Sequence, residues 1–293
     1  MTSLTVIPLV TKLSSKVIRI LGCNPGPMTL QGTNTYLVGT GHRRVLIDSG
    51  DEDTAPQYTK LLEDVLEKEK ATIEHLIVTH WHHDHIGGIE PVQKLLASKA
   101  QTKYQSLKIW KLPRSLADKE NSENDCNEQW TSLQDNQLIE VEGAKLVVKH
   151  TPGHTTDHAC LLLLNDNVLF SGDCILGEGT TVFEDLHDYM LSLENILKMA
   201  PYVIYPGHGP VVEDPDSRIR QYIEHRLKRE SAILKVLQDS KNPMTEMDIV
   251  KCIYKETPEY LWQAAASNVN HHLQKLLKEH KVLGETGSWC IVT

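Results

Sequence analysis

The chain has 293 residues, of which 40% are hydrophobic and 24% are charged. These fractions are typical of a folded globular protein and exclude a disordered chain, a collagen or a disulfide-stapled miniprotein. The formal net charge of −9 argues against a surface that is basic throughout. The longest wholly apolar runs, such as 159–164, are too short to cross a membrane. Fifteen histidines are an excess for such a chain, so their positions matter most.

The N-terminal part is free of acidic residues, because no Asp or Glu precedes Asp48. It does contain Lys12, Lys16 and Arg19, together with serines. Acid-poor, serine-containing N-termini are typical of mitochondrial targeting segments. Residues 16–21 also have the apolar pattern of a first β-strand. The two interpretations are compatible, because a terminus that folds can still be imported. Six irregularly spaced cysteines without a C-x-x-C pair indicate free thiols in a reducing compartment.

The first two-thirds of the chain alternates short apolar runs with turns and helices. The runs that predict strands are 16–21, 36–38, 45–47, 76–78, 108–110, 146–148, 161–164, 168–170 and 203–205. Helical spacing of apolar residues predicts helices over 58–70, 89–97 and 192–199. Residues 117–128 are polar and lack periodicity, which predicts an exposed loop.

The character of the chain changes after Pro215. Helices are predicted over 216–239, over 245–254 with Thr245 and Asp248 as its cap, and over 262–280. A hairpin is predicted over 282–292. Three helices followed by a hairpin indicate a small winged-helix-like domain, so we divide the chain into domains 1–220 and 221–293. Residues 218–293 hold 12 Lys or Arg against nine Asp or Glu, although these charges are scattered as on an ordinary solvated surface.

A block of histidines follows the buried run 76–78. Residues 79–88 read THWHHDHIGG. The chain therefore leaves a strand and presents four candidate ligands on a loop: His80, His82, Asp84 and His85. Alternating side chains of an extended segment share one side, which lets the first two histidines address one metal ion. Four imidazoles in six residues are poor packing material, because buried imidazoles without partners are costly. The block therefore predicts a metal site.

Three further strand ends carry one ligand type each. His154 follows the run 146–148, Asp173 follows 168–170, and His208 follows 203–205. Each segment alone is typical of an ordinary turn. Four strand ends that all deliver nitrogen or oxygen ligands predict a preorganised site on a rigid sheet.

The H-x-H-x-D-H motif with later lone His, Asp and His resembles the metallo-β-lactamase superfamily, and within it the glyoxalase II and RNase Z branch. This resemblance implies an α/β fold, a four-layer αββα sandwich, with two Zn²⁺ per chain. It implies that His80, His82 and His154 hold one zinc, that Asp84, His85 and His208 hold the second, and that Asp173 bridges them. Asp84 is also the candidate catalytic residue, which orients the attacking hydroxide. The second-site cysteine of the β-lactamases proper is missing here, and we interpret Cys174 as packing.

Longer stretches at 22–36, 172–186 and 205–210 resemble one group of this superfamily. The resemblance implies a dinuclear zinc endoribonuclease of the mitochondrial matrix that acts on single-stranded RNA, with no membrane partner. Zinc-bound hydroxide would then attack phosphorus in line, while the metal ions neutralise the developing charge. Cytoplasmic placement is the alternative localisation.

Two other functions stay open. The same metal pair suits thioester hydrolysis of the glyoxalase II type, since it would attack a carbonyl carbon as well. A non-catalytic nucleic-acid-binding module built on the C-terminal domain is the non-enzymatic alternative, although seven intact ligands count against it.

The remaining candidates carry weaker signals. His187 is interpreted either as a phosphate contact or as a surface histidine. Trp262 and Trp289 suit either base stacking or a hydrophobic core. The pair His271–His272 is predicted to lie on a helix surface. Histidines without an evident partner are His42, His75, His150, His158, His225 and His280.

Overall fold

The computed structural model describes residues 4–99, 107–114 and 130–292. Its first sheet has seven strands whose spatial order follows the chain. They are β1 (Val10–Lys12), β2 (Val17–Leu21), β3 (Asn34–Val38), β4 (Arg43–Ile47), β5 (Thr72–Val78), β6 (Lys108–Lys111) and β7 (Thr131–Ser132). Pairing is antiparallel from β1 to β4 and parallel from β4 to β7.

The second sheet has five strands in the order β12-β11-β10-β9-β8. They are β8 (Leu138–Val141), β9 (Ala144–His150), β10 (Ala159–Leu163), β11 (Val168–Gly172) and β12 (Val203–Pro206). Only the β11–β12 pair in this sheet is parallel. Parallel pairs require crossover connections, and a helix lies in the connection of each of the pairs β4–β5, β5–β6 and β11–β12.

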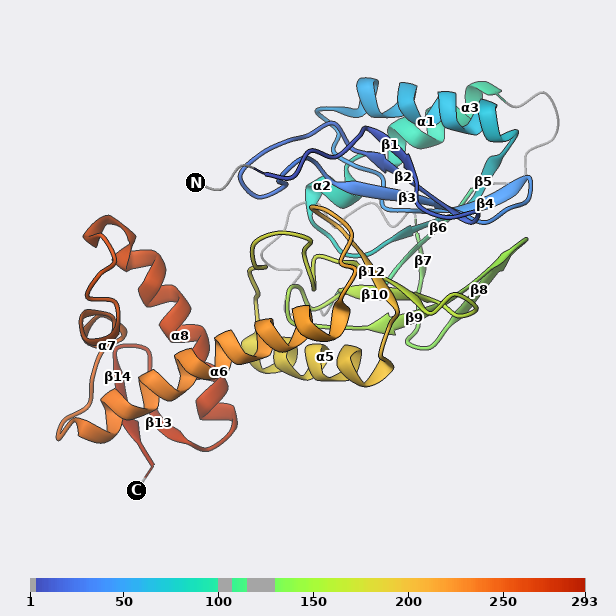
Figure 1. Cartoon of the computed structure of the whole chain (residues 1–293). Helices are drawn as coiled ribbons and strands as arrows, with labels where there is room; N and C mark the ends of the chain where they lie inside the picture. The colour runs from blue at the N-terminus through green and yellow to red at the C-terminus, as the bar shows by residue number, and fades with distance from the viewer. Residues whose placement is uncertain (1–3, 100–106, 115–129, 293) are drawn as a thin grey trace.

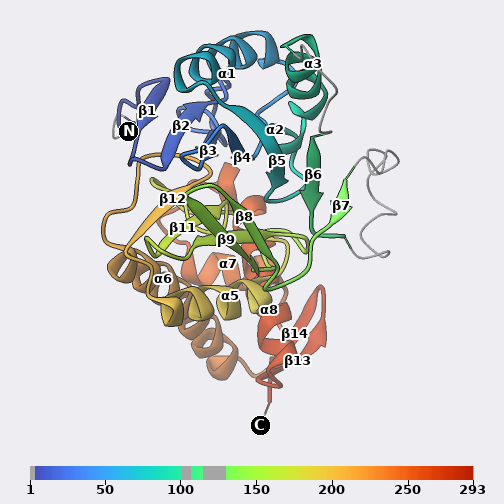
Figure 2. The ribbon, with the colours of Figure 1, turned by 90° about the vertical axis from the view of Figure 1, so that its right-hand side faces the viewer.

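Helices cover the outer face of each sheet (Figures 1 and 2). Helices α1 (Ala55–Glu69) and α3 (Ile89–Lys99) pack on the first sheet, and α5 (Leu186–Met199) packs on the second. A separate core between the sheets contains side chains of both, including Tyr36 and Phe170. The order helix, sheet, sheet, helix confirms the predicted four-layer αββα sandwich.

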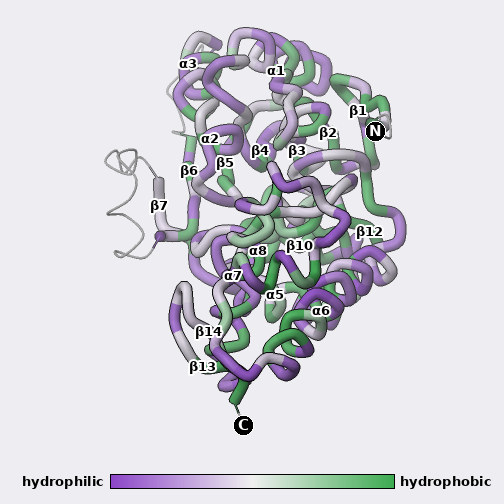
Figure 3. Tube along the Cα trace, turned by 90° about the vertical axis from the view of Figure 1, so that its left-hand side faces the viewer, coloured by the Kyte–Doolittle hydropathy of each residue, from purple (hydrophilic) through white to green (hydrophobic). Residues whose placement is uncertain are grey.

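The C-terminal part is helical and ends in a two-stranded hairpin. It contains α6 (Pro215–Asp239), α7 (Glu246–Ile253), the short 3₁₀ helix η1 (Glu259–Leu261), α8 (Trp262–Lys278), β13 (Val282–Glu285) and β14 (Ser288–Ile291). Thr245 and Asp248 form the expected capping box of α7. Figure 3 shows polar and apolar segments alternating along α6, as an amphipathic helix requires. The predicted boundary at residue 220 lies inside this continuous helix, and the division itself stays a prediction.

The predicted strands and helices are all present, with bounds shifted by a few residues. The sequence pattern did not predict β1, β7 and β8, which are short and mostly exposed, nor the short helices α2 (His83–Ile86) and η1. The loop predicted over 117–128 lies outside the described residues. None of the helices in the described ranges combines the length and apolarity that a membrane span requires.

Several single-residue interpretations need correction. His272 is 0% exposed and packs in the core of the C-terminal part, so its placement on a helix surface was wrong. Trp289 is also 0% exposed, which excludes base stacking, and Trp262 packs partly against the same core. Cys174 is fully buried beside α5, in agreement with a packing role. The five cysteines in the described ranges are free thiols.

Candidate metal centre

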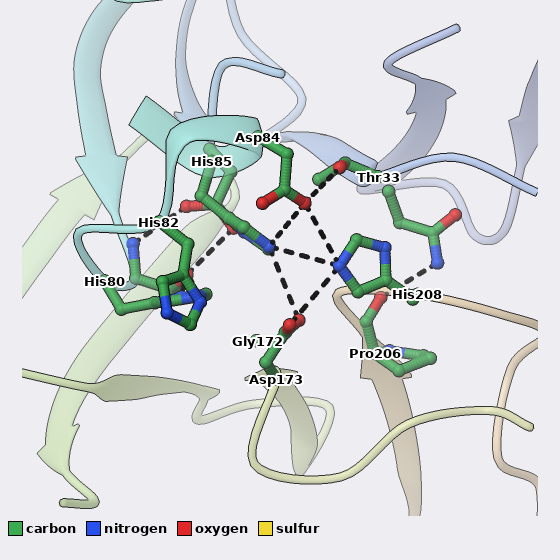
Figure 4. A network of polar contacts seen from close by, with 12 residues as sticks. Thr33, His80, His82, Asp84, His85, Gly172, Asp173, Pro206 and His208 are labelled. Atoms are coloured by element: carbon green, nitrogen blue, oxygen red, sulfur yellow. Dashed lines mark hydrogen bonds and ion pairs between the residues drawn. The ribbon is translucent and has the colours of Figure 1, made fainter. Parts of the chain in front are cut away.

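Loops at one edge of the two facing sheets bring all seven predicted ligands together, and Figure 4 labels all of them except His154. His80 and His82 follow β5, and Asp84 and His85 belong to α2. The others follow β9, β11 and β12: His154, Asp173 and His208. One detail differs from expectation, because residues 83–86 form a helical turn and not an extended loop. This turn directs Asp84 and His85 away from the first two histidines and toward a second position.

The first group consists of three imidazoles whose nitrogens face one another. His80 Nε2 lies 2.9 Å from His82 Nδ1, and His154 Nε2 lies 3.3 Å from His80 Nε2 and 3.0 Å from His82 Nδ1. Ligands of a tetrahedral zinc at about 2.0–2.1 Å lie about 3.3 Å apart. The triangle therefore has nearly the size that one zinc ion requires.

The second group has the same compactness. Asp84 Oδ2 lies 3.2 Å from the Nε2 atoms of both His85 and His208, which are 3.3 Å from each other. Asp173 faces both groups, with its oxygens 3.3 Å from His208 Nε2, 3.4 Å from His85 Nε2 and 3.7 Å from His154 Nε2. Its buried Oδ1 has no hydrogen-bond partner among the described residues. A carboxylate in this position suits a bridge between two ions.

The outer nitrogen of three imidazoles faces a hydrogen-bond acceptor. His80 Nδ1 lies 3.0 Å from Thr79 Oγ1, His85 Nδ1 lies 2.8 Å from Asp48 Oδ2, and His154 Nδ1 lies 2.8 Å from Val182 O. A proton on each outer nitrogen leaves the lone pair of the inner nitrogen directed into the site. This is the arrangement of imidazoles that ligate metals.

One carboxylate supports both groups. Asp48, which is 1% exposed, follows β4 and accepts hydrogen bonds from Thr79 N at 2.8 Å and Thr79 Oγ1 at 3.0 Å, in addition to His85 Nδ1. Thr79 in turn contacts His80. Asp48 has a left-handed backbone conformation with φ of 60°, which Asp tolerates better than most residues. Asp48 was not predicted from the sequence, although it is the polar residue directly after the apolar run 45–47.

Thr33 and Asn24 hold the catalytic candidate. Thr33 Oγ1 donates to Asp84 Oδ2 at 2.8 Å (Figure 4). Asn24 fixes Thr33 through two hydrogen bonds, one to its hydroxyl at 3.0 Å and one from its backbone N–H at 2.8 Å. Both residues lie in the stretch 22–36, whose resemblance to one group of the superfamily predicted no role for either of them.

His158 also supports the site, although the sequence showed no evident partner for it. Its Nε2 accepts the backbone N–H of Asp173 at 3.1 Å, and its Nδ1 lies 2.8 Å from Thr151 Oγ1. Gly172 allows this approach, since a Cβ at that position would lie 2.7 Å from His158 Nε2. His75 and His150 also have partners, namely Trp110 Nε1 and Thr156 O. The interpretation of these three histidines was therefore wrong.

The pKa shifts divide the site into two electrostatic environments. Burial, followed by neighbouring imidazoles, lowers the pKa of His82 to about 4 and that of His80 well below its usual range. Burial would also lower the pKa of His208, but Asp173 and Asp84 outweigh it and raise the pKa to about 9. Burial would raise the pKa of the Asp84 carboxyl, but His85 and His208 outweigh it and lower the pKa.

These observations test whether the residues fit a divalent metal. The first group offers neutral imidazole lone pairs at ligand spacing. The second offers carboxylates whose field stabilises positive charge. Donors are nitrogen and oxygen without a thiolate, a set that zinc accepts. The His/Asp cluster thus suits divalent metal ions in two adjacent positions.

Other candidates lie apart from the cluster. His187 contacts Asp188 Oδ1 at 3.0 Å at the start of α5, in a separate acidic group with Asp185. It does not join the seven ligands. Half-buried His271 lies against Phe183, with ring centroids 5.4 Å apart.

Comparison with known families decides the classification. The model of the metallo-beta-lactamase superfamily matches residues 28–208, which include all seven ligands. The chain belongs to the metallo-β-lactamase superfamily. A second model, the beta-lactamase associated winged helix domain, matches residues 245–289. The two models match separate parts of the chain, and the second agrees with the winged-helix-like fold predicted for the C-terminal part.

Relatives within the superfamily cover nearly the whole chain. A beta-lactamase-like protein 2 homolog of Drosophila melanogaster is 54% identical over 95% of this chain and 94% of that protein. A homolog of the same name from Caenorhabditis elegans is 44% identical over 99% and 94%. An atrochrysone carboxyl ACP thioesterase of Aspergillus fumigatus is 36% identical over 86% and 78%. A solved beta-lactamase domain protein from Burkholderia ambifaria shares the fold, with a TM-score of 0.75, 18% identity and coverage of 97% and 93%.

Proposed function

We propose that this chain is a dinuclear zinc endoribonuclease that cleaves single-stranded RNA. One observation carries the metal chemistry: two compact donor groups lie side by side, and Asp173 faces both. The choice of RNA rests on the resemblance of residues 22–36, 172–186 and 205–210 to a group of RNA-cleaving enzymes. The mildly basic C-terminal part would favour a polyanion, as the acidic remainder of the chain would not.

Two zinc ions, when bound, supply Lewis-acid activation of water and neutralise charge on the phosphate oxygens. His80, His82 and His154 would hold the first, and Asp84, His85 and His208 the second. Asp173 would hold both, in a position fixed by the hydrogen bond from its backbone to His158.

Asp84 is suited to accept a proton from the attacking water. Its side chain is 19% exposed, against 11% for Asp173 and 0% for His85. Thr33, His85 and His208 all contact its Oδ2, whereas Figure 4 shows no dashed contact from its other oxygen to the residues drawn. Thr33 therefore fixes the carboxylate plane through Oδ2, so the other oxygen is the one suited to accept the proton.

A second candidate is thioester hydrolysis, which the similarity to a fungal ACP thioesterase favours. The same donor groups would then act at a carbonyl carbon. Lys111 and Asp157 form a buried ion pair on the first-group side, through which β6 fixes the loop that carries His154. Both reactions require the same arrangement of these residues, so a substrate assay must decide between RNA cleavage and thioester hydrolysis.

The test incubates the purified protein in parallel with four substrates, each with and without EDTA. The substrates are single-stranded RNA, duplex RNA, single-stranded DNA and lactoylglutathione. We expect chelator-sensitive cleavage of single-stranded RNA. Thioester turnover without RNA cleavage would replace the first candidate by the second. The variants His80→Ala, Asp84→Ala and Asp173→Ala should lose bound metal and activity together, and a variant that keeps both zinc ions and full turnover would contradict the ligand assignment.

We also propose the mitochondrial matrix as the location, on the basis of the acid-free N-terminal part and the resemblance. Lys16 and Arg19 belong to the fold, because Lys16 pairs with Asp166 at 2.9 Å and Arg19 is buried in β2. Import would therefore keep these residues. Fractionation with protease protection tests the proposal, and a purely cytosolic protein would contradict it.

A further inference from the structure

The segment 176–185, which connects β11 to α5, passes beside the metal centre. Val182 O accepts the hydrogen bond from His154 Nδ1 at 2.8 Å, and Thr181 Oγ1 lies 3.2 Å from the same nitrogen. The backbone N–H of Glu184 also donates to Gly153 O at 2.8 Å. The orientation of the His154 imidazole thus depends on where this segment lies.

Helix α6 holds the segment through three side chains spaced four residues apart on one face. Arg218 Nη2 donates to Gly179 O at 2.8 Å and to Leu176 O at 3.1 Å. The Tyr222 hydroxyl donates to Gly179 O at 3.0 Å. Arg226 Nη2 donates to Thr181 O at 3.2 Å. Carbonyl groups of the segment therefore find their donors on α6.

Helix α8 contacts the same segment from the C-terminal part. Lys278 forms an ion pair with Asp185, and the His271 ring lies against Phe183. The Arg226 guanidinium also lies over the Phe183 ring, 4.8 Å from the ring centroid. Figure 1 shows α6 running from beside α5 into the C-terminal part, with α8 alongside it. Both helices thus join the C-terminal part to the segment that orients His154.

We propose that Arg226 is a positioning residue of the metal centre. Arg226 is 6% exposed, so its guanidinium contacts protein groups, namely Thr181 O and the Phe183 ring, and has little contact with solvent. By fixing the Thr181 carbonyl, Arg226 fixes the adjoining hydroxyl and the Val182 carbonyl, which set the tautomer and the plane of His154. Arg226 thereby acts on the first donor group, to which His154 belongs. This inference rests on the proposed metal centre.

The test compares Arg226→Gln with Arg220→Gln in the full-length protein. Arg220 is a matched control, because it is exposed on the same helix and pairs only locally with Asp216 at 2.7 Å. After thermal unfolding shows that the variants are folded, Co²⁺ titration against a competing chelator measures the two binding steps, and the visible spectrum follows each ion. We expect Arg226→Gln to weaken one step by about tenfold, the lower end of the range for outer partners of ligands, and to leave the other step unchanged. Arg220→Gln should match the wild type.

Tyr222→Phe decides the case if Arg226→Gln does not fold, because it removes only the hydroxyl, which donates to Gly179 O and accepts from Leu176 N. It should weaken the same step by about threefold, less than loss of a direct ligand partner. Folded variants that bind both ions as the wild type does would overturn the inference alone. Equal weakening of both steps would also overturn it, since that indicates a general loss of structure. A wild-type protein that binds no metal would overturn the proposed centre, and this inference with it.

Discussion

Replacing Asp48 by Asn changes the support of the metal centre while all seven ligands stay in place. Asp48 accepts hydrogen bonds from Thr79 and His85 and is buried. Its φ of 60° would strain most residues, but Asn tolerates the left-handed region. The substitution therefore tests the carboxylate and leaves the backbone unstrained, which Asp48→Ala would not do.

The expected magnitude follows from the donors that face Asp48. An Asn oxygen can accept from Thr79 N, but its NH₂ then faces His85 Nδ1–H, so two donors oppose each other. His85 must move its proton to Nε2, the atom that faces Asp84 and Asp173 at 3.2 Å and 3.4 Å. A hydrogen bond to a charged group contributes about 1.5–3 kcal/mol. Each 1.4 kcal/mol corresponds to about a tenfold change, so binding at the second group should weaken by about 10- to 100-fold.

The assay is a competition titration with Zn²⁺ or Co²⁺ that resolves both binding steps. Asp64→Asn is the control, because Asp64 lies exposed on α1 and pairs with Lys60. Asp48→Asn should weaken the second group strongly and the first less, through Thr79 and His80. Unchanged dissociation constants for both ions, in a variant that unfolds like the wild type, would refute the reasoning.

Three further predictions concern the fold and the site. Gly207→Ala should lose bound metal, measured by elemental analysis, because its Cβ would lie 2.3 Å from Asp173 Oδ1. Raising free Zn²⁺ should raise the Tm, and EDTA should reverse the rise. At 1,000 times the Kd of one site, the gain in unfolding free energy is about 4.1 kcal/mol. Burial, followed by Arg226 and Arg229, lowers the pKa of His272 to about 3, so the unfolded chain binds a proton that the folded chain does not between pH 6.5 and 3. Unfolding free energy should therefore fall by about 2 kcal/mol from pH 6.5 to pH 5, and His272→Leu, followed by denaturant unfolding, should remove this loss.

The ligands of the centre were predictable because each one lies within a few residues after an apolar run. Strand periodicity places the run in a sheet, and the polar residue that ends it must lie at the sheet edge. His154, Asp173 and His208 all follow this rule. The turn α2 was not predictable in the same way, since four residues are too few to show helical periodicity.

The residues that hold the ligands in place were mostly not predictable from the sequence, because their hydrogen bonds join residues far apart in the chain. Asp48 contacts His85 across 37 positions, and Thr33 contacts Asp84 across 51. No local spacing records such contacts. His272 is different, because it lies three residues after Val269 and four before Leu276, both fully buried. Helical spacing therefore did place it on the core face, and its polar character outweighed that signal in the analysis.

Helix α8 bears on the non-enzymatic alternative. In a helix-turn-helix domain, the N-terminal residues of the second helix contact base edges, and basic side chains neutralise phosphates. The exposed positions in the first two turns of α8 are Gln263, Ala264 and Ser267, and none of them is basic. Its C-terminal end carries Lys278, which pairs with Asp185 of the catalytic part. This ion pair joins the winged helix to the segment that orients His154, which favours a role within the hydrolase over an independent nucleic-acid reader.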